Sequence, residues 1–72
     1  MIKTNTMIAN ELYIKIKKVK KDYNCKTRVS QNTAFRIVDN WLTGEYVNNN
    51  IDLNQYFDAR SILKDEIYNI YK

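Results

Sequence analysis

Residues 30–44 have the sequence SQNTAFRIVDNWLTG, and this stretch is the strongest indication of the fold class. Ser30 or Asn32 is a suitable N-cap for a helix, and Gly44 stands where a left-handed C-cap is expected. The stretch therefore predicts an amphipathic helix from Ser30 to Thr43. Its apolar side chains recur at the spacing of one helix face, at Ala34, Ile37, Val38, Trp41 and Leu42.

A further helix is expected on each side of this stretch. Residues 6–23 precede it and have apolar side chains at helical spacing, at Ile8, Leu12, Ile16, Val19 and Tyr23. Residues 45–51 contain three consecutive asparagines and are expected to form a connection, because asparagine favours turns. Asp52 then caps a last helix, with Gln55 in the capping-box position. The apolar face of that helix is Leu53, Tyr56, Phe57, Leu63, Ile67, Ile70 and Tyr71.

Residues 1–72 are therefore expected to form one small all-α domain, a helix-turn-helix-like bundle of three to four helices. One cysteine, Cys25, and no histidine exclude an internal disulfide and a structural zinc site, and no cofactor is expected. The apolar runs are too short for a membrane span, and the first residues lack a signal-peptide core. Asn, Ile, Lys and Tyr have A/T-rich codons and supply 34 of the 72 residues. We therefore expect a cytoplasmic protein of a low-GC bacterium or of its phage.

Charge is divided unevenly between the two halves of the sequence. Residues 1–36 have a net charge of +7, whereas residues 37–72 have a net charge of −3. The lysines of the first helix form a candidate phosphate-binding stripe, and the alternative is an ordinary solvated helix face. A DNA-binding module is usually basic over most of its contact surface, so any function has to account for both halves.

Catalysis is not expected, and no catalytic residue is assigned. Histidine, the most frequent general base near neutral pH, is absent. The only adjacent acids, Asp65 and Glu66, point about 100° apart on a helix and so do not converge on a substrate. No base stands beside the thiol of Cys25 in the sequence. We therefore expect a binding protein that is not an enzyme.

Residues 29–38, VSQNTAFRIV, resemble the opening of a helix-turn-helix recognition helix. The residues before them, Lys26-Thr27-Arg28, lack the glycine turn of that motif, and an ordinary capped helix is the alternative. The resemblance implies a direct DNA-binding regulator, such as a Cro-like repressor or an excisionase, whose first helical turn reaches base edges. Its DNA-binding residues would be Gln31, Asn32 and Arg36, with Lys17, Lys20 and Lys21 on phosphates.

The whole chain resembles the modulator of repression (MOR) proteins, antirepressors of lactococcal temperate phages. The resemblance covers size, all-helical pattern, composition and residues 29–42. It implies 1:1 binding to the N-terminal DNA-binding domain of the phage CI repressor, which blocks operator binding, and action of the combined complex at a promoter. A phage inhibitor of a host enzyme would share the protein-binding character and is a further alternative.

Carboxylates and amides of such a protein would replace phosphates and base edges on the repressor's basic surface. Two candidate partner-binding surfaces fit this description, and the sequence leaves the choice between them open. The first is a row on the last helix, flanked by two apolar residues taken as exposed: Asn54, Asp58, Ser61, Asp65 and Asn69, with Ile62 and Tyr68. The second lies around the end of the middle helix: Asp39, Asn40, Thr43, Glu45 and Tyr46.

Overall fold

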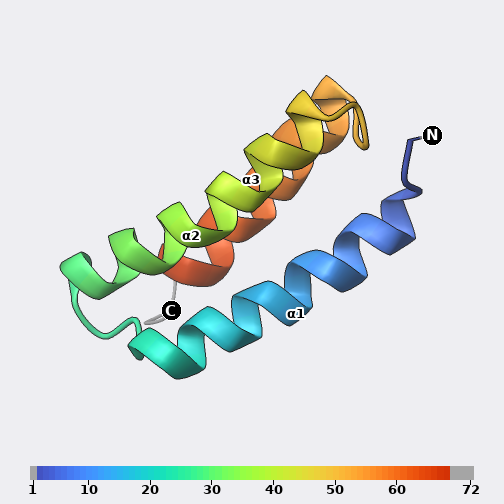
Figure 1. The fold of residues 1–72 in the computed structure, drawn as a ribbon. Coiled ribbons are helices and arrows are strands. Elements are labelled where there is room, and N and C mark those ends of the chain that lie inside the picture. Colours follow the sequence, from blue (N-terminus) through green and yellow to red (C-terminus); the bar gives the residue numbers. More distant parts are fainter. Residues whose placement is uncertain (1, 69–72) are drawn as a thin grey trace.

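The three amphipathic segments form three helices that run up, down and up alongside one another (Figure 1). They are α1 (Asn5–Tyr23), α2 (Arg28–Val47) and α3 (Leu53–Tyr68), in a computed structural model that describes residues 2–68. The α2–α3 turn lies beside the start of α1, and we call this the α2–α3 end of the bundle. The α1–α2 turn lies beside the last turn of α3, at the α1–α2 end. The predicted small all-α bundle is confirmed, with three helices in the described residues.

Helix α1 begins and ends within about a residue of the prediction. Thr4 is its N-cap, and the side chain accepts a hydrogen bond from the backbone N–H of Met7 at 3.2 Å. Asn24 ends it in a left-handed conformation, with φ of 63°, and its N–H donates to the carbonyl of Lys20. The predicted core residues are buried except Tyr23, which lies in the last turn of α1 and is 41% exposed.

Helix α2 is longer than predicted at both ends. Its N-cap is Thr27 rather than Ser30 or Asn32, and Thr27 and Ser30 form a reciprocal capping box. The C-cap prediction for Gly44 is wrong, because the helix continues through this residue to Val47 and the glycine has no positive φ. The last turn of α2 is held by contacts with the N-terminal segment, described below.

Helix α3 begins with the predicted capping box. The backbone N–H of Gln55 donates to Asp52 Oδ1 at 2.8 Å, and the N–H of Asp52 donates to Gln55 Oε1 at 2.9 Å. Its predicted apolar face is only partly buried, since Leu53 is 47% and Phe57 is 55% exposed, and Ala59 is buried instead. The predicted core residues Ile70 and Tyr71 lie outside the described residues.

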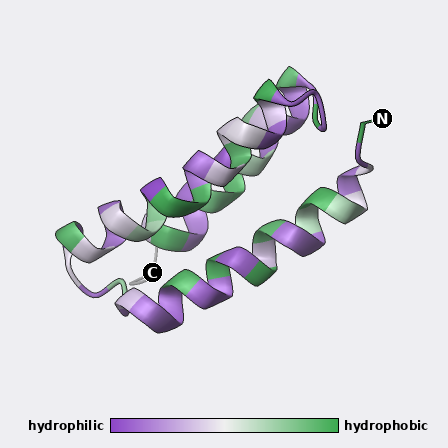
Figure 2. Ribbon diagram, in the orientation of Figure 1, coloured by the Kyte–Doolittle hydropathy of each residue, from purple (hydrophilic) through white to green (hydrophobic). Residues whose placement is uncertain are grey.

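The core runs the length of the bundle between the three helices. Figure 2 shows hydrophobic residues recurring among hydrophilic ones along each helix. Cys25, in the α1–α2 turn, is fully buried with a φ of 50°, and burial raises the pKa of its thiol. Trp41 is half-buried against the core, whereas Ile37, predicted on the same face, is 43% exposed. The buried apolar residues are Ile8, Leu12, Ile16, Val19, Cys25, Ala34, Val38, Leu42, Ile51, Ala59, Leu63 and Ile67.

None of the helices in residues 2–68 combines the length and apolar character that crossing a membrane requires.

Candidate partner-binding surface

Aromatic and aliphatic side chains gather on the surface where α2 and α3 meet, at the α2–α3 end. The rings of Tyr46 and Tyr56 lie 5.5 Å apart between centroids, and those of Tyr56 and Phe57 lie 5.7 Å apart. The hydroxyls of Tyr56 and Thr43 lie 3.4 Å apart, which joins the two helices. We call this surface the aromatic patch; it consists of Thr43, Tyr46, Val47, Leu53, Tyr56 and Phe57.

The aromatic patch is largely open to solvent. Val47 is 68% exposed, Phe57 55%, Leu53 47% and Tyr46 39%. Helix spacing explains their grouping, because Leu53 precedes Tyr56 and Phe57 by three and four residues and so shares a face with them. Contiguous exposed apolar side chains on a small protein mark an interaction site more often than isolated ones do. This surface is therefore the best candidate for partner binding.

The predicted polar row on α3 adjoins the aromatic patch. Asn54 lies one helical turn before Phe57 and Asp58, and Ser61 and Asp65 continue the row. All four of these polar residues are exposed, and the fifth member, Asn69, lies outside the described residues. An apolar centre with a polar border is the usual composition of a protein–protein interface.

The apolar residues predicted to flank this row are not its anchors. Ile62 and Tyr68 are half-buried and pack against the core, because each faces a neighbouring helix. The hydroxyl of Tyr68 also donates to Oδ1 of Asn32 on α2 at 2.6 Å. The exposed apolar residues beside the row are instead Leu53 and Phe57, which the sequence pattern assigns to the core.

The second predicted surface is divided by the fold. Thr43 and Tyr46 belong to the aromatic patch, and Asn40 is exposed nearby on α2. Asp39 is half-buried, and its Oδ1 lies 3.2 Å from Nε of Arg60. Glu45 is buried, so its prediction as a partner-binding residue is wrong.

Glu45 is held by a network that fixes the geometry of the α2–α3 end. Lys3 Nζ donates to one carboxylate oxygen of Glu45 and also to Glu11, while Asn50 Nδ2 donates to the other oxygen of Glu45. The Lys3 ammonium, with the Asn50 amide, lowers the pKa of the Glu45 carboxyl. Glu11 and Glu45 together raise the pKa of Lys3. The backbone N–H of Lys3 donates to the Asn50 carbonyl at 2.7 Å, so the N-terminal segment is joined to the α2–α3 turn.

The predicted DNA-reading residues are not all available to DNA. Gln31 is buried, and its amide donates to the carbonyl of Cys25 at 3.2 Å, so it closes the α1–α2 turn and does not reach base edges. Asn32 and Arg36 are exposed on α2. The helices of a helix-turn-helix motif meet at about 90–120°, whereas α2 runs back alongside α1 (Figure 1). The resemblance of residues 29–38 to a recognition helix stays a prediction.

The predicted lysines of α1 differ in their surroundings. Lys17 and Lys21 are exposed, while Lys20 is half-buried with Nζ 3.4 Å from Oε2 of Glu66 on α3. That ion pair links α1 to α3 at the α1–α2 end.

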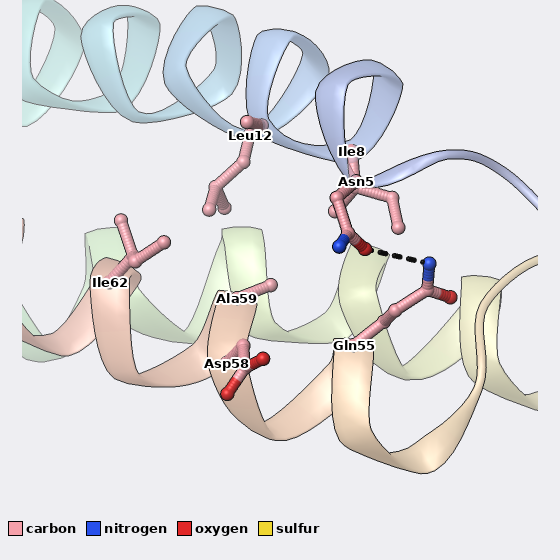
Figure 3. A pocket seen from close by; sticks show the side chains of 8 residues that line it. Asn5, Ile8, Leu12, Gln55, Asp58, Ala59 and Ile62 are labelled. Carbon is pink, nitrogen blue, oxygen red and sulfur yellow. Dashed lines mark hydrogen bonds between the residues drawn. The ribbon is translucent and has the colours of Figure 1, made fainter.

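A shallow apolar groove lies between α1 and α3 (Figure 3). Gln55 Nε2 donates to Asn5 Oδ1 at 3.0 Å at one end of it, and the carboxylate of Asp58 stands at its border. Its volume of about 240 Å³ is below the roughly 300–1,000 Å³ of small-molecule pockets. Among the described residues, no group of three His, Cys, Asp or Glu side chains could hold a metal ion. The apolar lining is Ile8, Ala9, Leu12, Ala59 and Ile62.

No protein-family model, curated protein or solved structure matches this chain.

Proposed function

We propose that this chain is a phage antirepressor, which binds the N-terminal DNA-binding domain of a CI repressor 1:1 in the bacterial cytoplasm. Bound in this way, it keeps the repressor from its operator. The observation that carries the proposal is the aromatic patch beside the polar row of α3, where Tyr46, Leu53 and Phe57 are exposed and lie outside the core. The MOR resemblance supplies the identity of the partner.

The chemistry of the two neighbouring surfaces suits a basic partner. Exposed aromatic and aliphatic side chains such as Phe57 and Tyr46 supply apolar contact area, and tyrosines are among the residues that contribute most to binding energy at interfaces. The carboxylate of Asp58 lies next to Phe57 on α3, and that of Asp65 lies two helical turns further along the same polar row. A repressor's DNA-binding surface is rich in Lys and Arg, so these carboxylates would take the place of DNA phosphates.

A direct reader of DNA sequence is the weaker proposal. That function needs Gln31 at base edges, and the Gln31 amide is committed to the Cys25 carbonyl inside the fold. The aromatic patch would also have no role in it, because base-edge recognition uses the first turn of α2 at the opposite end of the bundle.

The experiment is a gel-shift titration with the CI repressor of a lactococcal temperate phage and its operator, at about 50 mM salt. This chain alone, the repressor alone and the mixture are compared. We expect no shift from this chain alone at sub-micromolar concentration, and a loss or alteration of the repressor's shift in the mixture. An unchanged repressor shift at saturating concentrations of this chain would refute the proposal.

Two variants then locate the surface. Phe57→Ala removes an exposed anchor of the aromatic patch and is expected to weaken repressor binding roughly 30-fold, the equivalent of about 2 kcal/mol at a hot spot. Ile14→Ala is the matched control, because Ile14 is 69% exposed on α1, away from the α2–α3 surface. Equal effects of the two variants on the Kd, measured by calorimetry, would show that the aromatic patch is not the binding surface.

A further inference from the structure

The α1–α2 end of the bundle has a second surface of a different character. A groove of about 580 Å³ lies between α2 and α3. None of its lining residues that the structure describes has a carboxylate, whereas three of them are cations. Its charged and aromatic lining is Arg28 and Phe35 from α2, with Arg60, Lys64 and Tyr68 from α3. We call it the cationic groove.

Two of the three cations are held in place by aromatic rings. The guanidinium of Arg28 lies 5.5 Å from the ring centroid of Tyr68, and that of Arg60 lies 5.8 Å from the ring of Phe35. The ring centroids of Phe35 and Tyr68 are 5.6 Å apart, so the two rings pack against each other in the groove. A positioned guanidinium loses less entropy when it binds a ligand than a freely rotating one does.

Hydrogen-bond donors remain available at both arginines. Asp39 Oδ1 lies 3.2 Å from Nε of Arg60 in an ion pair, and a guanidinium has five N–H donors in all. Lys64 follows Arg60 by one helical turn and so stands on the same face of α3. Oδ1 of Asn32 accepts a hydrogen bond from the hydroxyl of Tyr68, and the NH₂ group of Asn32 is a further donor in the groove that Arg28 also lines. The arrangement is suited to an oxyanion with several acceptor atoms.

Outside the groove, the same end of the bundle has more cations than acids. The last turns of α1, the α1–α2 turn, the start of α2 and the end of α3 all lie at this end (Figure 1). The acids at the same end are Asp22, Asp65 and Glu66, and Glu66 is paired with Lys20. The cations outside the groove are Lys17, Lys18, Lys20, Lys21, Lys26 and Arg36.

We propose that the cationic groove binds phosphate groups, and that these belong to the phosphodiester backbone of nucleic acid. Arginine forks match the geometry of phosphate oxygens and bind them bidentately. The groove is open to solvent and belongs to a chain with a net charge of +4, which fits a polymeric anion better than a single small one. The groove extends from the α1–α2 end to Arg60 and Ser61 in the middle of α3, so it borders the polar row. Arg28 and Lys64 belong to neither the aromatic patch nor the polar row, so their replacement tests this proposal separately from repressor binding.

The test compares two double variants of equal charge. Arg28→Gln with Lys64→Gln removes two groove cations and leaves the rings and Asp39–Arg60 in place. Lys17→Gln with Lys18→Gln is the control, because both lysines are exposed on α1 and neither lines the groove. The affinity for a fluorescein-labelled DNA duplex of about 20 base pairs is measured by anisotropy between about 50 and 200 mM salt. Circular dichroism confirms that each variant is folded.

A plot of the logarithm of the binding constant against the logarithm of the salt concentration has a negative slope, and each phosphate contact contributes about −0.9 to it. We expect this slope to be about 1.8 less steep for the groove variant, because two contacts are lost. Near 0.1 M salt, the loss of each contact is expected to raise the Kd roughly tenfold. The control is expected to keep the wild-type slope. Equal losses in the two variants would indicate diffuse attraction and overturn the proposal, as would no binding of the duplex at about 50 mM salt.

A titration with pyrophosphate separates the two sources of phosphate. Amide chemical shifts of Arg28, Asn32 and Lys64 are followed by NMR with pyrophosphate and with the duplex. Shifts with both ligands are expected if the groove binds backbone phosphates. Shifts with pyrophosphate alone would overturn the assignment to nucleic acid in favour of a free phosphate compound.

Discussion

Replacement of Glu45 by glutamine tests the network that joins the N-terminal segment to the α2–α3 turn. The Glu45 side chain is 10% exposed, and both its carboxylate oxygens accept hydrogen bonds, from Lys3 and from Asn50. The amide of a glutamine would turn a donor toward one of these two donors, so at least one charge-assisted hydrogen bond is lost. Such a bond contributes about 1.5–3 kcal/mol, so we expect a destabilisation of about 2 kcal/mol for Glu45→Gln.

The other carboxylate on Lys3 provides the matched control. Glu11 Oε2 lies 2.9 Å from Lys3 Nζ, but the Glu11 side chain is 42% exposed. Solvent-exposed ion pairs contribute about 0.2–1 kcal/mol, so Glu11→Gln is expected to cost well under 1 kcal/mol. In a domain of this size 1 kcal/mol changes the Tm by about 4–8 °C. The Tm should therefore fall by roughly 10 °C for Glu45→Gln and by only a few degrees for Glu11→Gln.

The pH dependence gives a second readout of the same interaction. Because the pKa of Glu45 is lowered in the folded state, its contribution to stability is fully present above its ordinary pKa of 4.5. That contribution is lost as the pH falls from 4.5 through the folded pKa. The difference in unfolding free energy between wild type and Glu45→Gln should therefore shrink on acidification.

Urea unfolding followed by circular dichroism at neutral and acidic pH measures these differences. Equal destabilisation by Glu45→Gln and Glu11→Gln at neutral pH, or a difference that does not depend on pH, would refute the buried role of Glu45. Repressor binding by the folded Glu45→Gln variant is expected to be unchanged, because Glu45 is not on the surface.

Three further changes test the helices and the core. Gly44→Ala should stabilise the protein by about 0.5–1 kcal/mol, since the position is helical and nothing lies within 4 Å of the added Cβ; destabilisation in urea would restore the C-cap interpretation. Leu63→Ala should cost about 2–5 kcal/mol, because Leu63 is fully buried, whereas Ile14→Ala should change the unfolding free energy by less than about 0.5 kcal/mol. The thiol of Cys25 should react slowly with a disulfide reagent until urea unfolds the chain, and rapid reaction of the native protein would contradict its burial.

The position of each helix could be predicted wherever the signals are local. The apolar spacing of residues 6–23 and the Asp52–Gln55 capping box act within a few residues, and they placed helix α1 and the start of α3 correctly. The end of α2 could not be placed in this way. Gly44 resembles a C-cap, but the last turn of α2 is extended past it by the contacts of Glu45 with Lys3.

The apolar spacing predicted most of the buried residues correctly. It assigned exposed residues to the core at the surface where α2 and α3 meet. Leu53 and Phe57 fit the apolar spacing of α3 but lie at the edge of its apolar face, where the side chains of α2 do not cover them. Ala59 and Ile51 are buried instead, although neither stands out in the sequence. Periodicity identifies the apolar side of a helix, whereas the position of its neighbours decides how wide the buried strip is.

The sequence by itself determined the helical class, two of the three helix starts and the polar row of α3. Only the tertiary structure decided that Glu45 and Gln31 lie inside while Phe57 stays outside. In the sequence the positive charge is concentrated in the first half, whereas in the structure it is concentrated at the α1–α2 end of the bundle. This happens because the antiparallel helices bring the end of α3 beside the α1–α2 turn. Capping and periodicity depend on residues a few positions apart, but the partners of Glu45 and of the groove cations come from distant parts of the chain.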